Sequence, residues 1–267
     1  MVFSNKPTYN LKLDIRIDGH QIGEVYETKF LGIYIESKHT WKEHIKYISG
    51  KISRGNGMVI KARKFLNRES LMNIYYSFFY PYITYCNHIW GNANKTSLNR
   101  ITILQKKIVR IICHEKHRAH TEQLFNKLGV IKFIDLNKYL IARFMFRWYR
   151  NETPTIFDNY FDLNRDVHSY STRQAELLHI PHVRTNMAKL GLRYYGAVIW
   201  NKILRLGFSV DTSEAVLYLM VDFNPLLLSQ FPYGKHKKIR IKLDKMIAQF
   251  FVIVNTDDTA PTTAGHL

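Results

Sequence analysis

The first 36 residues carry a pattern that is typical of β-strands. Apolar residues alternate with polar or charged ones over residues 11–17, which is the two-residue period of a half-buried strand. Asp18-Gly19 follows, a pair favoured in hairpin turns. A second apolar run covers residues 30–35 and ends before Glu36. The pattern predicts a small antiparallel β-hairpin over residues 1–36.

After residue 37 the period becomes that of a helix. The pair Thr40 and Glu43 has the spacing of a capping box, which predicts a helix start there. Gly55 and Gly57 interrupt the pattern and predict a kink, because glycine weakens a helix interior. The apolar residues of this helix recur at steps of three, four or seven and form one face: Trp41, Ile45, Ile48, Ile52, Val59, Ala62 and Leu66.

The helical pattern continues to about residue 204. Asn67 is a candidate N-cap of a second helix, which Pro81 should end or bend, since proline disfavours helical geometry at the residue before it. A third helix is predicted from about Ser97 to Cys113, with an apolar and a basic face. Further helices are predicted at 121–128, closed by Gly129, at 135–150 and at about 190–204. Residues 255–267 are small and polar, which predicts disorder. The predicted fold class is mainly α with a small N-terminal antiparallel β-hairpin.

Charge narrows the possible partners. The 267 residues include 39 Lys+Arg and 21 Asp+Glu, a formal net charge of +18. Residues 41–118 hold 15 of the basic residues and three of the acidic ones, so 12 of the 18 net charges lie in under a third of the chain. An excess of this kind attracts polyanions, either nucleic acid or an anionic membrane surface. The clustering favours nucleic acid.

Targeting signals and cysteines suggest an intracellular chain. Cys86 and Cys113 are too few for a disulfide framework. The N-terminus lacks the apolar region of a signal peptide. No stretch reaches the roughly 18 apolar residues of a spanning helix. We therefore expect a soluble protein of the cytoplasm or nucleus that is not secreted and has no membrane partner.

Two clusters of polar residues are candidate sites, the first for zinc and the second as three carboxylates that could share one helix face. Cys113, His114, His117 and His120 are ligand-type residues close together, but their spacing matches no known zinc pattern, so a polar loop is favoured. The second cluster lies in a segment without apolar periodicity, where like charges at this spacing repel, so a solvated loop is favoured. Its carboxylates are Asp158, Asp162 and Asp166.

Aromatic and arginine side chains offer further candidates. Trp90 and Trp200 could stack on bases, as aromatics do in single-strand binders. Their apolar neighbours favour a place in the core instead. Arg173 and Arg184 lie in a basic stretch, where contact with phosphate and plain solvation are both open.

Three groups of segments follow one another in a specific order and spacing over roughly residues 1–206. The first group is 29–35 (KFLGIYI), 41–45 (WKEHI) and 51–54 (KISR). The second is 74–76 (IYY), 81–86 (PYITYC) and 89–91 (IWG), followed by 104–112 (LQKKIVRII). The third is 170–174 (YSTRQ), 184–185 (RT) and the stretch from Gly196 to 200–201 (WN). Together these segments resemble LINE-type, jockey-like reverse transcriptases of retrotransposons without long terminal repeats.

The resemblance implies a division of the chain. Residues 1–36 correspond to the end of the palm, with a primer-grip-like hairpin, and residues 37–130 to a helical thumb. Residues 131–206 correspond to a helical C-terminal extension, and residues 207–267 are a divergent, partly disordered tail. The fold expected is thus a thumb-like helical bundle with a remnant of the palm.

The resemblance also implies nucleic-acid contacts. A thumb holds the template–primer duplex, an RNA/DNA hybrid or DNA, by its backbone, which positions it without reading its sequence. An ordinary strand glycine at Gly32 and a merely solvated basic face on the third helix remain open. The expected nucleic-acid-binding residues are Leu31, Gly32, Lys42, Lys46, Lys51, Arg54, Lys61, Arg63, Lys64, Lys106, Lys107 and Arg110.

One departure from the family concerns catalysis. These polymerases use two metal ions held by aspartates, one set in a Phe/Tyr-x-Asp-Asp motif. The only Asp-Asp pair here is Asp257-Asp258, in the polar tail. We therefore expect no catalytic or metal-binding residue and no cofactor in this chain. Mg²⁺ is expected only for an intact polymerase, and the missing palm and fingers are expected partners. The resemblance thus implies the function of a nucleotidyltransferase family, RNA-directed DNA polymerisation, but we expect this chain alone to be inactive.

Two alternatives stay open at this point. The chain could be a non-catalytic module that binds nucleic acid or protein. It could also be an inert translated remnant of a mobile element.

Overall fold

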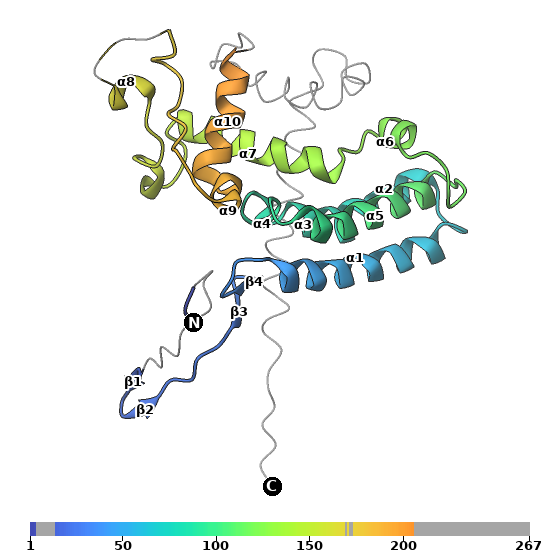
Figure 1. Ribbon diagram of the computed structural model, residues 1–267. Coiled ribbons are helices and arrows are strands. Elements are labelled where there is room, and N and C mark those ends of the chain that lie inside the picture. The colour runs from blue at the N-terminus through green and yellow to red at the C-terminus, as the bar shows by residue number, and fades with distance from the viewer. Residues whose placement is uncertain (4–13, 169, 171–172, 206–267) are drawn as a thin grey trace.

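The computed structural model describes residues 1–3, 14–168, 170 and 173–205 (Figure 1). The described part is mainly helical with small antiparallel hairpins near the N-terminus, so the predicted fold class is confirmed. The tail predicted at 207–267, with Asp257-Asp258, lies outside these residues, as do Leu11 and Leu13. The division into four segments stays a prediction.

Two hairpins replace the single one expected over residues 1–36. β1 (Arg16–Ile17) pairs with β2 (His20–Gln21) around Asp18-Gly19, as predicted. β3 (Glu27–Phe30) pairs with β4 (Ile33–Glu36), so the apolar run at 30–35 is not one strand. It turns back at Leu31-Gly32, where the φ angles are 45° and 78°. Positive φ at both central residues is the mark of the tight turns that fit strand twist.

Helix α1 (Lys42–Ala62) begins differently from the prediction. The capping box is wrong, because the first residue before the helix is Trp41 in a left-handed conformation and Thr40 caps no amide. The carboxylate of Glu36, at the end of β4, accepts a 2.6 Å hydrogen bond from the Glu43 amide and another from the Thr40 hydroxyl. A carboxylate is favourable at this positive end of the helix dipole. The cap of α1 therefore comes from the preceding hairpin, and the spacing of residues at the helix start cannot show this.

The glycines of α1 do not interrupt it. The helix runs through Gly55 and Gly57. Gly55 is buried, and a Cβ built there would lie 3.2 Å from the carbonyl oxygen of Phe78 on the next helix. The missing side chain therefore lets the two helices approach closely.

The other helices of the first bundle lie near their predicted positions. Asn67 caps α2 as predicted, since its side chain accepts a 2.9 Å hydrogen bond from the Ser70 amide. The helix is interrupted between α2 and α3, beside Pro81, as also predicted. Gly129 closes α6 in a left-handed conformation. The bounds are α2 (Arg68–Phe78), α3 (Tyr80–Thr84), α4 (Asn87–Trp90), α5 (Lys95–Ile112), α6 (Glu122–Leu128) and α7 (Phe133–Tyr149).

Helices α1, α2 and α5 lie side by side, and the hairpins project from the end where α1 begins (Figure 1). The core between them includes Ile52, Tyr75 and Trp90. A second hydrophobic cluster forms where α7 packs on α10, around Met145 and Trp200.

The C-terminal elements end in a predicted helix. The helix predicted at about 190–204 is present as one helix over residues 192–205, and the sequence pattern missed a separate short helix that ends before it at Leu190. Asn201 fixes the preceding loop, since its side chain exchanges hydrogen bonds of 2.9 and 2.8 Å with the backbone of Leu178. The elements are a 3-10 turn (Thr155–Phe157), α8 (Asn164–Val167), α9 (Asn186–Leu190) and α10 (Leu192–Arg205).

Gly91 offers a test of core packing. A Cβ built there would lie 2.4 Å from Asn87 Oδ1 and 2.5 Å from Asn137 Nδ2, two atoms that are themselves hydrogen-bonded at 2.9 Å. Gly91→Ala should therefore break this buried pair and lower the free energy of unfolding by about 2 kcal/mol. Gly50→Ala on α1 is the control, because no atom of the described residues lies within 4 Å of a Cβ built at that position. It should stabilise the helix by about 0.5–1 kcal/mol. Equal effects of the two changes in urea unfolding would contradict the packing described.

Candidate nucleic-acid interface

The exposed face of α1 carries a row of cations. Ile45, Ile48 and Ile52 face the core, so the 3.6-residue period turns the opposite face to solvent. Lys46 makes a 3.1 Å ion pair with Glu43, and the row is otherwise basic. A rise of 1.5 Å per residue makes the row about 28 Å long. We call it the α1 stripe, and its members are Lys42, Lys46, Arg54 and Lys61, all exposed.

Lys51 lies off the stripe. It is half-buried, and its Nζ is 5.5 Å from the centre of the Tyr47 ring, a cation–π contact. Arg63 and Lys64 follow α1 directly and are exposed. They extend the basic surface past the end of the helix.

The tip of the β3–β4 hairpin lies at the other end of α1. Leu31 is 73% exposed, and its carbonyl accepts a 2.7 Å hydrogen bond from the Tyr85 hydroxyl. Tyr85 thus fixes the tip against the bundle. Gly32 has a φ of 78°, a conformation that glycine adopts readily. The turn therefore explains this glycine, and contact with a primer end stays a prediction.

On α5 the three expected cations do not form one free face. Lys106 and Lys107 are exposed but consecutive, so they lie about 100° apart around the helix. Arg110 is half-buried, and its Nε donates a 2.8 Å hydrogen bond to the Ala119 carbonyl. The Arg110 guanidinium therefore holds the loop after α5 in place through this bond. Phosphate contact by these three side chains stays a prediction.

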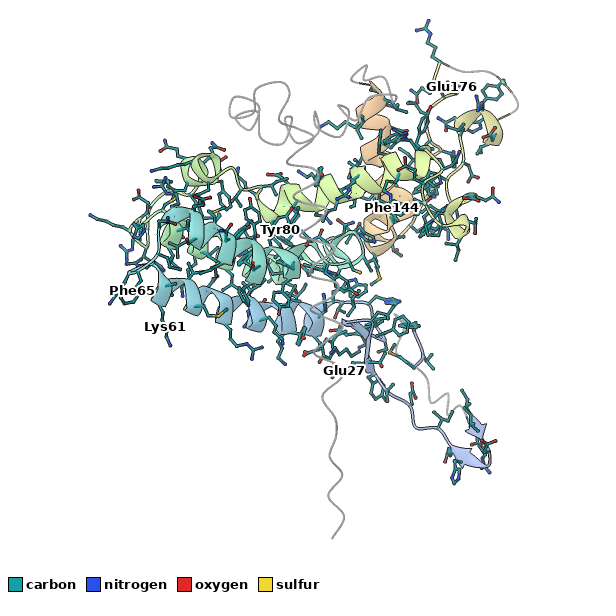
Figure 2. The ribbon with its side chains drawn as sticks, turned by 180° about the vertical axis from the view of Figure 1, so that it is seen from behind. Glu27, Lys61, Phe65, Tyr80, Phe144 and Glu176 are labelled. Carbon is teal, nitrogen blue, oxygen red and sulfur yellow. The ribbon has the colours of Figure 1, made fainter. Side chains whose placement is uncertain are left out.

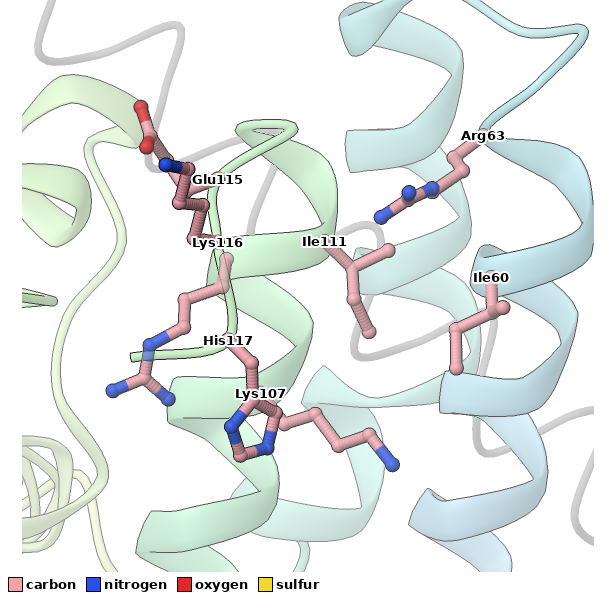
Figure 3. A pocket seen from close by; sticks show the side chains of 8 residues that line it. Ile60, Arg63, Lys107, Ile111, Glu115, Lys116 and His117 are labelled. Carbon is pink, nitrogen blue, oxygen red and sulfur yellow. The ribbon is translucent and has the colours of Figure 1, made fainter. Parts of the chain in front are cut away.

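A surface groove of about 410 Å³ joins the end of α1 to α5 (Figure 3). It brings together Arg63, Lys107 and Arg110, which are far apart in sequence. The sequence did not predict its other members, because the hydrophobic period of α1 or of α5 does not show that the ends of these two helices lie together. The lining residues are Ile60, Arg63, Lys107, Arg110, Ile111, Glu115, Lys116 and His117.

The tryptophans are core residues, as favoured. Trp90 and Trp200 are buried, and Trp90 Nε1 donates to the Tyr85 carbonyl at 2.8 Å. Neither can stack on a base. Arg173 and Arg184 are exposed, and both interpretations of them remain open.

The two polar clusters do not form ligand sets. Cys113 is buried, whereas His114, His117 and His120 are exposed. Among the residues with described positions, no three His, Cys, Asp or Glu side chains gather as metal ligands. Asp162 instead pairs with Arg193 at 3.2 Å.

A buried histidine joins the hairpin to α1. His44 is 2% exposed, its Nδ1 lies 3.5 Å from the Tyr34 amide, and its ring meets the Trp90 ring edge-on at 5.3 Å. Its Nε2 is buried and has no hydrogen-bond partner among the residues that the structure describes. Burial lowers the pKa of His44 from 6.5 to about 4, because a charged imidazole would lose its hydration there.

This histidine predicts a pH dependence of stability. The unfolded chain binds a proton at His44 near pH 6.5 and the folded chain only near pH 4, so stability is full above pH 6.5 and falls as the pH drops toward 4. The loss amounts to about 3 kcal/mol. Urea unfolding of His44→Gln between pH 7 and pH 4.5 should show a shallower decline than the unmodified chain. His117→Gln, an exposed control, should not. Parallel declines in all three proteins would contradict the burial of a neutral His44.

Among the residues that the structure describes, no helix is long and apolar enough to cross a membrane. No model of a protein family matches the chain. No solved structure matches it either.

Curated relatives do match in sequence. The chain is 29% identical over 137 residues to the RNA-directed DNA polymerase from mobile element jockey of Drosophila melanogaster. This match covers 50% of this chain and 15% of that protein. The jockey polymerase of Drosophila funebris is 28% identical over 45% of this chain and 14% of its own length. The probable RNA-directed DNA polymerase from transposon BS of Drosophila melanogaster is 28% identical over 41% and 12%. Over about half of its length, the chain is therefore similar in sequence to the RNA-directed DNA polymerases of these mobile elements, and it spans less than one sixth of their length.

Proposed function

We propose that this chain holds a nucleic-acid duplex by its phosphate backbone along the exposed face of α1. The α1 stripe carries the proposal, because it presents four cations over about 28 Å on a rigid helix. Duplex phosphates of one strand are about 3.4 Å apart along the axis, so a row of this length spans about eight base pairs measured along the duplex.

The chemistry of the stripe favours holding over reading. Three of its four cations are lysines, flexible point charges that suit phosphates and not the fixed pattern of a base edge. Phosphate contacts fix a duplex in place and carry no sequence information. Sequence-independent holding is what a polymerase needs of the part that grips its template and primer.

The relatives supply the setting. Their names describe polymerases that make DNA on RNA, and the matched region is about one seventh of their length. We infer that residues 37–130 are the thumb of such a polymerase and act on RNA/DNA or DNA duplexes. Since the sequence has no Phe/Tyr-x-Asp-Asp motif, polymerisation would need carboxylates from elsewhere.

A protein partner for the hairpins is the second candidate. Ile17, Tyr26 and Phe30 are all more than half exposed. Within the part of the chain that the structure describes, each hairpin has two strands, so their outer edges are open there to further pairing. The palm of a polymerase would supply such a partner. Without such a partner, the open edges of two copies can pair with each other, so Ile17→Ser together with Phe30→Ser should reduce self-association in sedimentation while duplex affinity stays unchanged.

Binding of unrelated duplexes tests the proposed function. A DNA duplex and an RNA/DNA hybrid of about 12 base pairs exceed the length of the stripe. By fluorescence anisotropy, two unrelated sequences should bind with the same affinity. The slope of log K against log salt should be roughly −3.6 or steeper, since each phosphate contact contributes about 0.9. A strong preference for one sequence, or affinity that salt does not change, would refute duplex holding.

A further inference from the structure

The most exposed apolar side chain near the basic surface is Phe65, which is 85% exposed. It lies in the turn between α1 and α2, two residues after Arg63. The backbone of the turn is fixed, because the Phe65 and Leu66 amides both donate to the Ala62 carbonyl, at 2.9 and 3.0 Å. Figure 2 shows Phe65 and Lys61 together at one end of α1, with Glu27 at the opposite end. The ring is thus presented to solvent on a defined support.

Its surroundings separate Phe65 from an ordinary exposed apolar residue. Single exposed apolar residues are common and need no explanation. Phe65, however, stands among Arg63, Lys64 and Arg68, all of them exposed. Aromatic rings within basic surfaces are how proteins bind single strands, since every base has a face that can stack.

The groove beside the turn repeats this combination. Ile60 and Ile111 supply apolar surface between the helices, and Arg63, Lys107 and Lys116 stand around it (Figure 3). Two residues of chain span at most about 7 Å, so the backbone that carries the Phe65 ring lies within this distance of Arg63 at the side of the groove. Duplex phosphates gain nothing from contact with apolar surface, whereas an unpaired base can pack against it.

We propose that Phe65 and this groove bind a single-stranded nucleic-acid segment that continues from the duplex end. Phe65 stacks on an unpaired base, and Arg63, Lys107 and Lys116 contact its neighbouring phosphates. This site rests on the proposed duplex-holding function, because Lys61 ends the α1 stripe four residues before Phe65. A strand that leaves a duplex on the stripe at this end meets the ring next.

The charge and the ring together favour nucleic acid over an acidic peptide. The groove has one carboxylate, Glu115, against its several cations, so either polyanion would be attracted. The continuity with the α1 stripe argues for the same ligand on both surfaces. An exposed ring on a fixed turn adds stacking, which a carboxylate-rich peptide would not use.

Overhang binding tests the proposal on the full chain. The probes are a blunt DNA duplex of about 12 base pairs, the same duplex with an oligothymidine overhang at either end, and free oligothymidine. Phe65→Ala should weaken overhang binding at least about 5-fold, the lower bound for stacking of one base, and leave blunt-duplex binding unchanged. Phe65→Trp should keep the affinity, and its added fluorescence should be quenched by the overhang but not by the blunt duplex. Tyr26→Ala, which removes an exposed ring near the hairpins, should change neither.

The outcomes separate this site from the duplex function. An unmodified chain that gains nothing from an overhang, or Phe65→Ala lowering blunt and overhang binding equally, would overturn the single-strand site. Displacement by polyglutamate as effective as that by oligothymidine of equal charge would also overturn it. Phe65-dependent binding of oligothymidine without any binding of the blunt duplex would support this site and refute the duplex-holding function instead.

Discussion

Gln105→Leu is expected to lower the free energy of unfolding by about 3–5 kcal/mol. Gln105 is 1% exposed and lies at the centre of the first bundle. Its Nε2 donates to the Tyr75 hydroxyl at 3.1 Å and to the Ile131 carbonyl at 2.9 Å, and its Oε1 accepts from the Phe133 amide at 2.8 Å. One side chain therefore connects α2, α5 and the start of α7.

The size of the effect follows from the partners that remain. Leucine fills a similar volume but leaves these polar groups buried without hydrogen bonds. Each such group costs about 1–3 kcal/mol. Typical domains have only about 5–15 kcal/mol of stability, so the variant should unfold at a much lower urea concentration.

The matched control is Gln123→Leu, at an exposed position of α6. It should change the free energy of unfolding by no more than about 0.5 kcal/mol. Urea unfolding followed by tryptophan fluorescence measures both variants. A Gln105→Leu protein as stable as the control would mean that Gln105 does not connect the three elements.

The helices were predictable from sequence, and the contacts between them were not. Periodicity located α5, since Ile101, Ile108 and Ile112 repeat on one face and are buried. The same periodicity gives no sign that Gln105 joins them, because a polar residue on an apolar face looks like an interruption. The cap of α1 was missed for a similar reason, since Glu36 reaches the helix from a neighbouring hairpin.

The candidate site divides in the same way. The α1 stripe follows from the period of a single helix, so sequence found Lys42, Lys46, Arg54 and Lys61. The groove depends on where the end of α1 meets α5, so Lys116 and the apolar surface at Ile111 were missed. The bond from Arg110 to the Ala119 carbonyl was not predictable either, because it depends on how the loop after α5 returns to that helix.

Several segments behind the family resemblance serve the fold. Trp90, Gly91 and Gln105 lie in the first core, and Asn201 fixes the loop at Leu178 in the second part. Packing of this kind constrains residue identity strongly, because buried polar groups must find partners. A resemblance that rests on such residues predicts a shared fold better than it predicts chemistry.

Neutralising the α1 stripe is expected to have the largest effect on binding. Replacing its four cations, Lys42, Lys46, Arg54 and Lys61, with glutamine removes four proposed phosphate contacts. At about 0.1 M salt the duplex affinity should fall on the order of a thousandfold. Stability should change little, because all four side chains are exposed and the Lys46–Glu43 pair is a surface ion pair.

The control carries the same change in net charge at other places. Lys95, Lys127, Lys189 and Arg205 are exposed on α5, α6, α9 and α10. Replacing these four with glutamine lowers the overall charge equally and leaves the α1 stripe intact. Comparison of the two variants therefore separates a local surface from the attraction of a basic protein as a whole.

The salt dependence of duplex binding by these two variants tests duplex holding by α1 most directly. The stripe variant should show a slope of log K against log salt that is flatter by about 3–4 units, equally for unrelated duplex sequences. The control variant should keep nearly the slope of the unmodified chain. If both variants lose the same affinity and the same slope, the exposed face of α1 is not where the duplex is held.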